Sequence, residues 1–373
     1  MSERASAATT AAKKSTVKKS TTKSSRTKAN GHASKPINLA LQGGGSHGAF
    51  TWGVLDALLE DGRLKFEGAS GTSAGAMNAV VLAHGLARAD ADGLKGQARY
   101  EAARVALARF WDGVGLMGAF QSGLPLAATQ MVASWWTQWL SPTQANPLGL
   151  NPLRQLLERE VDFDLLRQSP ALKAFVAATN VRTGRGEIFN DDRLSASAVM
   201  ASACLPTLFK AVEIDGEHYW DGGYSGNPAI YPLIYNTKTS DVLLVQINPI
   251  EADFSPSASA QEIAERINEI TFNAPLLAEA RAIEFVSRLL QEGRLDAKKY
   301  KRMRFHRVDG GAALAAFGAA SKSRSDTAFL HQLFDLGRAA GKDWLTKNFR
   351  HIGEKTTGSA THLLSTHLPT AAP

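Results

Sequence analysis

The strongest candidate for chemistry in this sequence is a serine between two glycines, in the stretch GTSAG that runs from Gly71 to Gly75. The pattern G-x-S-x-G is typical of a nucleophilic serine on a tight turn between a strand and a helix. At such a turn the helix dipole and unpaired N–H groups favour developing negative charge. Residues 64–70 are expected to form a strand and residues 73–86 a helix, so the context predicts that Ser73 is a nucleophile.

A serine hydroxyl is a poor nucleophile until a base takes its proton. Histidine is the usual base, and the order of residues along the chain would allow His306 or His331, although neither follows a strand in a glycine-rich loop. Asp221 is the other candidate, because it ends an aromatic strand and precedes Gly222 and Gly223. Those glycines would let the backbone hold a carboxylate and let another segment approach closely. An ordinary Asp-Gly hairpin turn fits the same letters, so the base stays open at this point.

A second glycine-rich motif, GGGSHG, follows the apolar run at 37–42. Its glycines are Gly43, Gly44, Gly45 and Gly48. Successive backbone N–H groups in such a turn bind anions. One interpretation is a dinucleotide site with Glu67 as the ribose-binding acid, but a lone G-x-G-x-x-G is a weak signal and leaves Ser73 and Asp221 without a role.

The elements that would position these motifs follow an alternating order. Strand, glycine turn and helix occur twice within fifty residues, which predicts an α/β fold with parallel strands. The first helix is expected over residues 47–61. Further strands are expected at 175–179, 242–247 and 303–308, and long helices at 261–291 and 326–349.

The charge of the chain is unevenly distributed. The net charge is +7 over 373 residues, but residues 1–36 hold nine Lys or Arg and one acid, so the remainder is close to neutral. This Ala/Ser/Thr-rich stretch has one large aliphatic side chain, Val17, and is predicted to be a disordered tail. It would either serve as a solubilising tail or contact a polyanion such as nucleic acid, anionic lipid or a granule surface.

Cysteine content and hydropathy favour a cytoplasmic location, with peripheral contact to a membrane or granule as an option. Cys204 is the only cysteine, so an internal disulfide and a cysteine zinc site are excluded. We find no secretory signal pattern, no apolar run of eighteen residues and no calcium loop in the sequence, and we expect no metal or cofactor. Residues 353–373 are expected to form a mobile end.

An uncharged segment, residues 113–153, contains Trp135, Trp136 and Trp139 at helical spacing. A core helix packed on the sheet is one interpretation. The other is an apolar cap that lines a site for acyl chains.

Together, GGGSHG, GTSAG and the DGG that ends VMASACLPTLFKAVEIDGEHYWDGG make the chain resemble the patatin-like phospholipases over about residues 37–250. The resemblance implies a three-layer α/β sandwich with a mostly parallel central sheet, a hydrolase domain over residues 37–352 with C-terminal helices at 259–350, and a lipid or other acyl-ester substrate. It further implies that Ser73 is the nucleophile, that Asp221 is its base in a Ser–Asp dyad, and that the N–H groups of Gly43, Gly44 and Gly45 form the oxyanion hole.

One position departs from that family. His47 stands where the family's glycine motif often carries arginine, so a permanent charge is replaced by a side chain that ordinarily titrates near neutrality. A non-enzymatic scaffold, anchored by the basic tail to a membrane, a granule or nucleic acid, remains the alternative to a serine acyl hydrolase.

Overall fold

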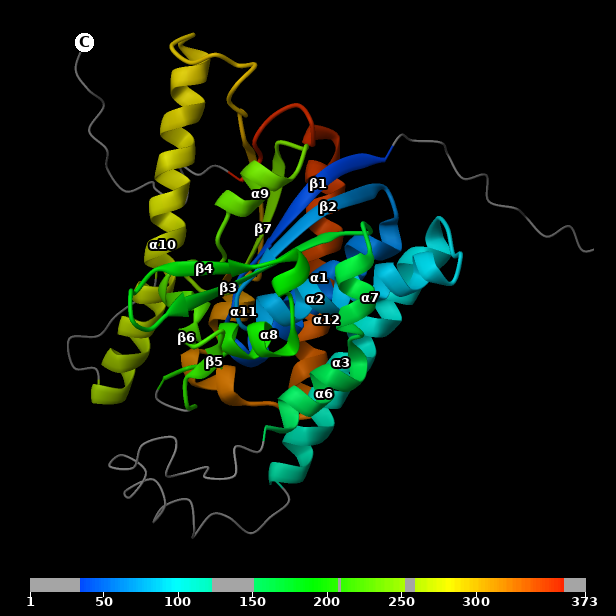
Figure 1. Cartoon of the computed structure of the whole chain (residues 1–373), viewed down its shortest axis with the longest axis vertical. Helices are drawn as coiled ribbons and strands as arrows, with labels where there is room; N and C mark the ends of the chain where they lie inside the picture. Colours follow the sequence, from blue (N-terminus) through cyan, green and yellow to red (C-terminus); the bar gives the residue numbers. More distant parts are fainter. Residues whose placement is uncertain (1–33, 123–150, 207–208, 252–258, 359–373) are drawn as a thin grey trace, which may run out of the picture. The chain divides into compact units, whose positions relative to one another are not determined.

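The computed structural model describes residues 34–122, 151–206, 209–251 and 259–358, which all belong to one unit beginning at Ser34. In this part of the chain, eight strands form one sheet (Figure 1). The strands are β1 (Lys35–Leu41), β2 (Leu64–Gly71), β3 (Lys173–Asn180), β4 (Gly186–Phe189), β5 (Val212–Ile214), β6 (Glu217–Asp221), β7 (Asp241–Gln246) and β8 (Arg304–Asp309).

The sheet has the order β5-β6-β3-β2-β1-β7-β8, and β4 also pairs with β3. Neighbours from β3 to β8 are parallel, whereas β4, β5 and β6 pair antiparallel at one end. The five parallel strands are the five that the sequence predicts, and the mostly parallel sheet is confirmed. Lys35 and Pro36, which fall in the tail expected from composition, are the first residues of β1.

Helices connect the strands, and the four predicted from the sequence are present within a few residues. The α-helices are α1 (Gly48–Asp61), α2 (Ala74–Ala91), α3 (Gln97–Ser122), α6 (Pro152–Glu160), α7 (Phe163–Gln168), α8 (Ala196–Ser202), α9 (Tyr231–Asn236), α10 (Ala260–Gln291), α11 (Gly311–Ala315) and α12 (Thr327–Asn348). Short 3-10 turns are η1 (Gly45–His47), η2 (Asp191–Arg193), η3 (Gly222–Tyr224), η4 (Ala319–Ser323) and η5 (Phe349–His351). The expected apolar cap is described only in part. The end of α3 includes residues 113–122 of it, while Trp135, Trp136 and Trp139 lie outside the described residues.

Both faces of the sheet are covered, as the continuous apolar sequence of β7 requires. Leu243 and Val245 pack in the core that includes α1, α2, α3 and α12, whereas Val242 and Leu244 pack with α9 and α10. Figure 1 shows the sheet between these two groups of helices. The three-layer α/β sandwich is therefore confirmed.

The parallel strands also fix where chemistry can occur. The carboxyl ends of β1, β2 and β7 meet at one edge of the sheet, where ligands bind in open α/β folds. The glycine-rich motif follows β1, and GTSAG closes β2 and begins α2. Among the helices that the structure describes, none is both long enough and apolar enough to cross a bilayer.

Candidate active site

Ser73 lies on a strained turn between β2 and α2. Its φ of 53° and ψ of −122° place a non-glycine residue at positive φ, which costs energy and is typical of functional sites. The Ser73 N–H donates to Ser202 Oγ on α8 at 2.9 Å, and the next turn is closed by the N–H of Gly75 on the Thr72 carbonyl at 2.8 Å. Ser73 is half-buried at the start of α2, so the turn is fixed by backbone hydrogen bonds while the residue stays partly accessible to solvent.

The glycines on either side of Ser73 are required by close backbone packing. A Cβ on Gly71 would lie 2.3 Å from the Gly75 carbonyl oxygen, and a Cβ on Gly75 would lie 2.1 Å from that of Leu41. Both distances are far below van der Waals contact, so side chains here would push the turn away from β1. The spacing of G-x-S-x-G thus follows from the contact between the serine turn and the neighbouring strand.

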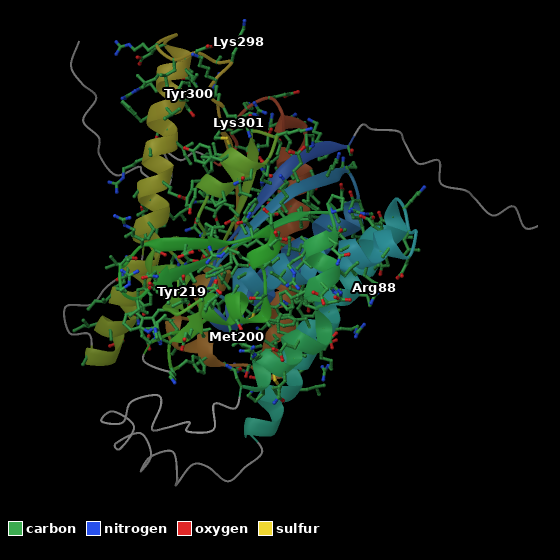
Figure 2. All side chains as sticks on the ribbon, viewed as in Figure 1. Arg88, Met200, Tyr219, Lys298, Tyr300 and Lys301 are labelled. Atoms are coloured by element: carbon green, nitrogen blue, oxygen red, sulfur yellow. The ribbon has the colours of Figure 1, made fainter. Side chains whose placement is uncertain are left out.

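Asp221 is the last residue of β6, and it enters the site from the antiparallel end of the sheet. Its N–H donates to the Cys204 carbonyl at 2.8 Å, and its own carbonyl accepts from Thr179 Oγ1 at 2.8 Å. A Cβ on Gly222 would lie 2.1 Å from the Ala177 carbonyl oxygen and 3.1 Å from Thr72 Cγ2, so the DGG turn packs directly against the serine turn. Figure 2 labels Tyr219 of β6, in the strand that carries Asp221.

The carboxyl of Asp221 is buried and is only 1% exposed as a residue. Oδ1 accepts the Gly223 N–H at 2.7 Å, while Oδ2 has no partner of full hydrogen-bond geometry among the described residues. Burial raises the pKa of Asp221 to about 7, and the Gly223 N–H and the nearby Ser73 hydroxyl oppose that rise. The Ser73 hydroxyl therefore approaches the carboxyl closely enough to lower its pKa without completing a well-formed bond. A carboxylate whose pKa is raised toward neutrality has the basicity that general-base catalysis requires.

The glycine-rich turn lies beside Ser73, because a Cβ on Gly43 would come within 2.8 Å of Ser73 Cβ. The Gly43 N–H already donates to Asn227 Oδ1 at 2.6 Å, which differs from the expectation that three glycines share one role. Position 45 requires glycine for two reasons. Its φ is +57°, and a Cβ there would lie 2.3 Å from the Lys322 carbonyl oxygen. For the N–H groups of Gly44 and Gly45 we find no acceptor in the described part of the chain, so these two are the available donors.

Three polar residues that the motif search did not single out hold this site together. Ser202 fixes the backbone of Ser73, and Asn227 and Asn248 donate from Nδ2 to the Gly43 carbonyl at 3.4 and 2.7 Å. Asn227 and Asn248 are each followed by proline and lie within a few residues of a motif or strand, a turn signal that could have been noted from the sequence. Figure 2 labels Met200 of α8, the helix that carries Ser202.

His47 carries no charge near neutral pH. Burial and the nearby Lys322 lower the pKa of His47 to about 4. Its Nε2 lies 2.7 Å from Ser321 Oγ, and Ser321 Oγ donates to the Gly318 carbonyl, so Nε2 is the protonated nitrogen. The expectation of a side chain that titrates near neutrality is therefore wrong at this position, because the imidazole is desolvated.

The competing bases lie elsewhere. His306 Nε2 donates to Asp241 Oδ1 at 2.9 Å and its Nδ1 contacts Thr357 Oγ1, both at the amino-terminal end of the parallel strands. His331 is exposed and contacts Asp112. Neither histidine is brought to Ser73.

Glu67, the ribose-binding acid of the dinucleotide interpretation, has a different role in the structure. Glu67 Oε2 accepts the N–H groups of Lys238 and Thr239 at 2.9 and 2.8 Å. This carboxylate stabilises the loop before β7, which argues against a role in binding a ribose.

A cavity of about 510 Å³ lies next to the glycine turn, between β7, β8 and the segment that carries Lys322. Its lining includes His47, Asn248 and Lys322, and among the described residues it does not include Ser73 or Asp221. We therefore locate the candidate site by the contacts between the serine and aspartate turns. In the described residues no group of three or more His, Cys, Asp or Glu is arranged to hold a metal ion.

Comparisons with known proteins give a family match over the part of the chain that carries both Ser73 and Asp221. A family model described as patatin-like phospholipase matches residues 39–234, which is more than half of the chain. A search of curated proteins finds no match. Among solved structures, VipD from Legionella pneumophila is 17% identical, with 82% of this chain and 67% of that chain covered. Its TM-score of 0.33 is too low for that likeness to carry an argument.

Proposed function

Because this chain belongs to the patatin-like phospholipase family, we propose that it is a serine acyl hydrolase that cleaves lipid esters through Ser73 and Asp221. The observation that carries the proposal is the buried carboxyl of Asp221, which has an unpartnered oxygen and a pKa raised to about 7 beside the Ser73 hydroxyl. A purely structural carboxylate at this depth would be paired with a cation or fully hydrogen-bonded.

The reaction begins with proton transfer from Ser73 Oγ to Asp221 Oδ2. Oγ attacks the ester carbonyl carbon, and the electron pair of the carbonyl bond moves to oxygen. The N–H groups of Gly44 and Gly45 stabilise that oxyanion, at the start of a helix where negative charge is favoured. When the tetrahedral intermediate collapses, the alcohol leaves with the proton from Asp221, and the acyl group stays on Ser73.

The second half reaction regenerates the enzyme. Asp221 takes a proton from a water molecule that attacks the acyl-enzyme, and a second oxyanion forms at the same donors. Its collapse releases the carboxylic acid and returns the proton to Ser73 Oγ. No metal or cofactor is used in these steps, since proton transfer and backbone donors supply the chemistry.

The substrate class is a carboxylic ester of a lipid, as the family implies. We further propose peripheral contact with a lipid surface, where such substrates are found. Residues 1–36 and the tryptophans at 135, 136 and 139 are candidates for that contact and for an acyl-lining surface, and both lie largely outside the described residues.

The proposal is tested with Ser73→Ala in hydrolysis of a short nitrophenyl ester and of phospholipid vesicles. We expect a loss of at least about 10⁴-fold in kcat for both substrates, as in other serine hydrolases. The matched control is Ser323→Ala, an exposed serine that donates to the Ala320 carbonyl, and it should keep wild-type rates. Hydrolysis by Ser73→Ala at more than a tenth of the wild-type rate would contradict the assignment.

A further inference from the structure

The peptide group between Gly43 and Gly44 is held from its carbonyl side. Gly43 O accepts Asn248 Nδ2 at 2.7 Å and, more weakly, Asn227 Nδ2 at 3.4 Å. The Gly44 N–H belongs to the same planar peptide group as this carbonyl. Whatever orients the Gly43 carbonyl therefore also orients the Gly44 N–H, which is one of the two donors proposed for the oxyanion.

The chain of hydrogen bonds extends one step further, to a lysine. Lys322 Nζ donates to Asn248 Oδ1 at 2.9 Å, and its side chain is four-fifths buried. Lys322 comes from η4, nearly 280 residues after the glycine turn, and its backbone carbonyl packs against Gly45. An ammonium group, a side-chain amide and a backbone peptide are thus connected in series.

Among the described residues, Lys322 is the cation that is hydrogen-bonded to Asn248. Its partner Glu269 lies 3.3 Å away and is also paired with Arg266, so the acid is not neutralised by Lys322 alone. Burial lowers the pKa of Lys322, and the attraction of Glu269 opposes that change. His47, the nearest titratable group on the glycine turn, is neutral.

We propose that Lys322 is a positioning residue for the oxyanion hole, acting through Asn248 on the Gly43–Gly44 peptide. Donation to the Gly43 carbonyl polarises that peptide, and hydrogen bonds in series strengthen one another. As negative charge develops on the substrate oxygen, the N–H of Gly44 becomes a better donor because the chain ends in a positive charge. The effect is therefore larger in the transition state than in the ground state, and it should alter kcat more than KM. This inference rests on the proposed function.

The test compares Lys322→Met with Lys322→Arg in the full-length protein. Methionine keeps an unbranched side chain as far as Cε and removes the ammonium group, and Glu269 keeps Arg266 as a partner. We expect Lys322→Met to lower kcat about 10–100-fold with KM changed less than threefold, somewhat less than the loss of a direct oxyanion donor. Lys322→Arg restores the charge and should stay within fivefold of wild type. The matched control is Lys342→Met, a lysine that pairs with Glu60 on the exposed face of α12.

A second readout separates positioning from simple support of the fold. A trifluoromethyl ketone forms a charged tetrahedral adduct on the serine, whereas an ether analogue of the lipid binds without an oxyanion. Lys322→Met should weaken the ketone by the same factor as kcat and leave the ether within twofold. Equal weakening of both inhibitors, or an unchanged kcat, would overturn the inference.

Two further results keep the outcome clear. If Lys322→Met does not fold, the kcat of Lys322→Arg is compared with that of Lys322→Gln. A kcat of Lys322→Arg more than three times that of Lys322→Gln supports the role of the charge, and a smaller ratio rejects it. If wild-type protein hydrolyses no ester and Ser73 reacts with no fluorophosphonate, the proposed function itself fails. If a fluorophosphonate labels Ser73 but substitution of Lys322 does not change kcat, the proposed function stands and only the role of Lys322 is rejected.

Discussion

Asp221 and Asp241 are two carboxyls of one sheet, each only 1% exposed, in opposite surroundings. Asp221, at the site, accepts a hydrogen bond from the Gly223 N–H and forms no ion pair with the described residues. Asp241, at the start of β7, accepts a two-point contact from Arg304 at 3.0 and 2.6 Å, His306 Nε2 at 2.9 Å and the Gly353 N–H at 3.0 Å. One carboxylate is buried beside the Ser73 turn with few hydrogen-bond partners, and the other accepts several hydrogen bonds at the far end of the strands.

The pKa shifts follow from that difference. Burial dominates at Asp221 and raises its pKa to about 7. Burial acts the same way on Asp241, but hydrogen bonds from His306, Arg304 and the Gly353 N–H outweigh it, so the pKa of Asp241 lies well below its usual range. Two carboxyls of equal solvent exposure therefore have pKa values shifted in opposite directions, because their hydrogen-bond partners differ.

The consequences for stability have opposite signs. Because the pKa of Asp241 is lowered in the folded state, its stabilisation is present above the unfolded pKa near 4 and is lost as the pH falls below that value. Because the pKa of Asp221 is raised, the folded state holds its proton more tightly than the unfolded state. That carboxyl therefore lowers the free energy of unfolding as the pH rises from about 4, and the cost is complete above about 7.

The largest effect should come from Asp221→Asn. We expect kcat for ester hydrolysis to fall by about 10²–10⁴-fold, since the variant lacks the base. Its free energy of unfolding at pH 8 should be equal to or higher than that of wild type, by up to a few kcal/mol, because a buried charge is removed. Urea unfolding and initial rates measure both quantities. Asp215→Asn, on the exposed hairpin turn before β6, is the matched control and should change neither.

The aspartate-to-asparagine substitution at Asp241 should lower the stability of the protein and leave its turnover nearly unchanged. Asp241→Asn leaves Arg304 without its carboxylate partner, and breaking a buried pair in this way costs about 3–5 kcal/mol. The melting temperature should fall, while kcat per folded molecule stays within threefold of wild type. A variant that keeps full stability but loses turnover would show that Asp241, with His306, takes part in catalysis.

The pH dependence of kcat/KM should report Asp221 alone. The base must be ionised, so kcat/KM is expected to rise about tenfold per pH unit below the pKa and to level off above about 7. His47→Asn should leave that midpoint unchanged, because the imidazole is already neutral in this range. A midpoint that moves by a full unit in His47→Asn would assign the ionisation to the histidine.

The smallest effect is expected from the basic tail. Since β1 begins at Lys35, removing residues 2–33 spares the sheet and should leave hydrolysis of a soluble ester within twofold. Sedimentation with anionic vesicles, with double-stranded DNA as the alternative polyanion, then measures what the tail binds. A tenfold loss of soluble-ester turnover would show that the tail contributes to the site.

Much of the fold could be predicted from the sequence because its parallel strands carry apolar residues and end at turn signals. β1 and β2 each run into a glycine-rich turn, whereas the apolar run of β7 ends at an Asn-Pro turn, and each carboxyl end bears part of the candidate site. The short antiparallel strands β4 and β5 were not predicted, since three or four half-buried residues give no clear period.

The candidate site could be predicted less completely. Ser73 and Asp221 stand out because tight turns force glycines around them. Asn248 and Lys322 could not be assigned, because the roles proposed for them depend on contacts with the glycine turn from segments about 200 and 280 residues away in the sequence. The charge state of His47 was missed for a related reason, since burial is a property of the packed structure.

The most direct test of the Ser–Asp dyad is the rate at which a fluorophosphonate labels the protein, with the modified residue mapped by peptide mass spectrometry. The dyad predicts a single label on Ser73 whose rate rises with an ionisation near pH 7, and a rate at least about 10²-fold lower in Asp221→Asn. Labelling of a different serine, or an unchanged rate in Asp221→Asn, would contradict it.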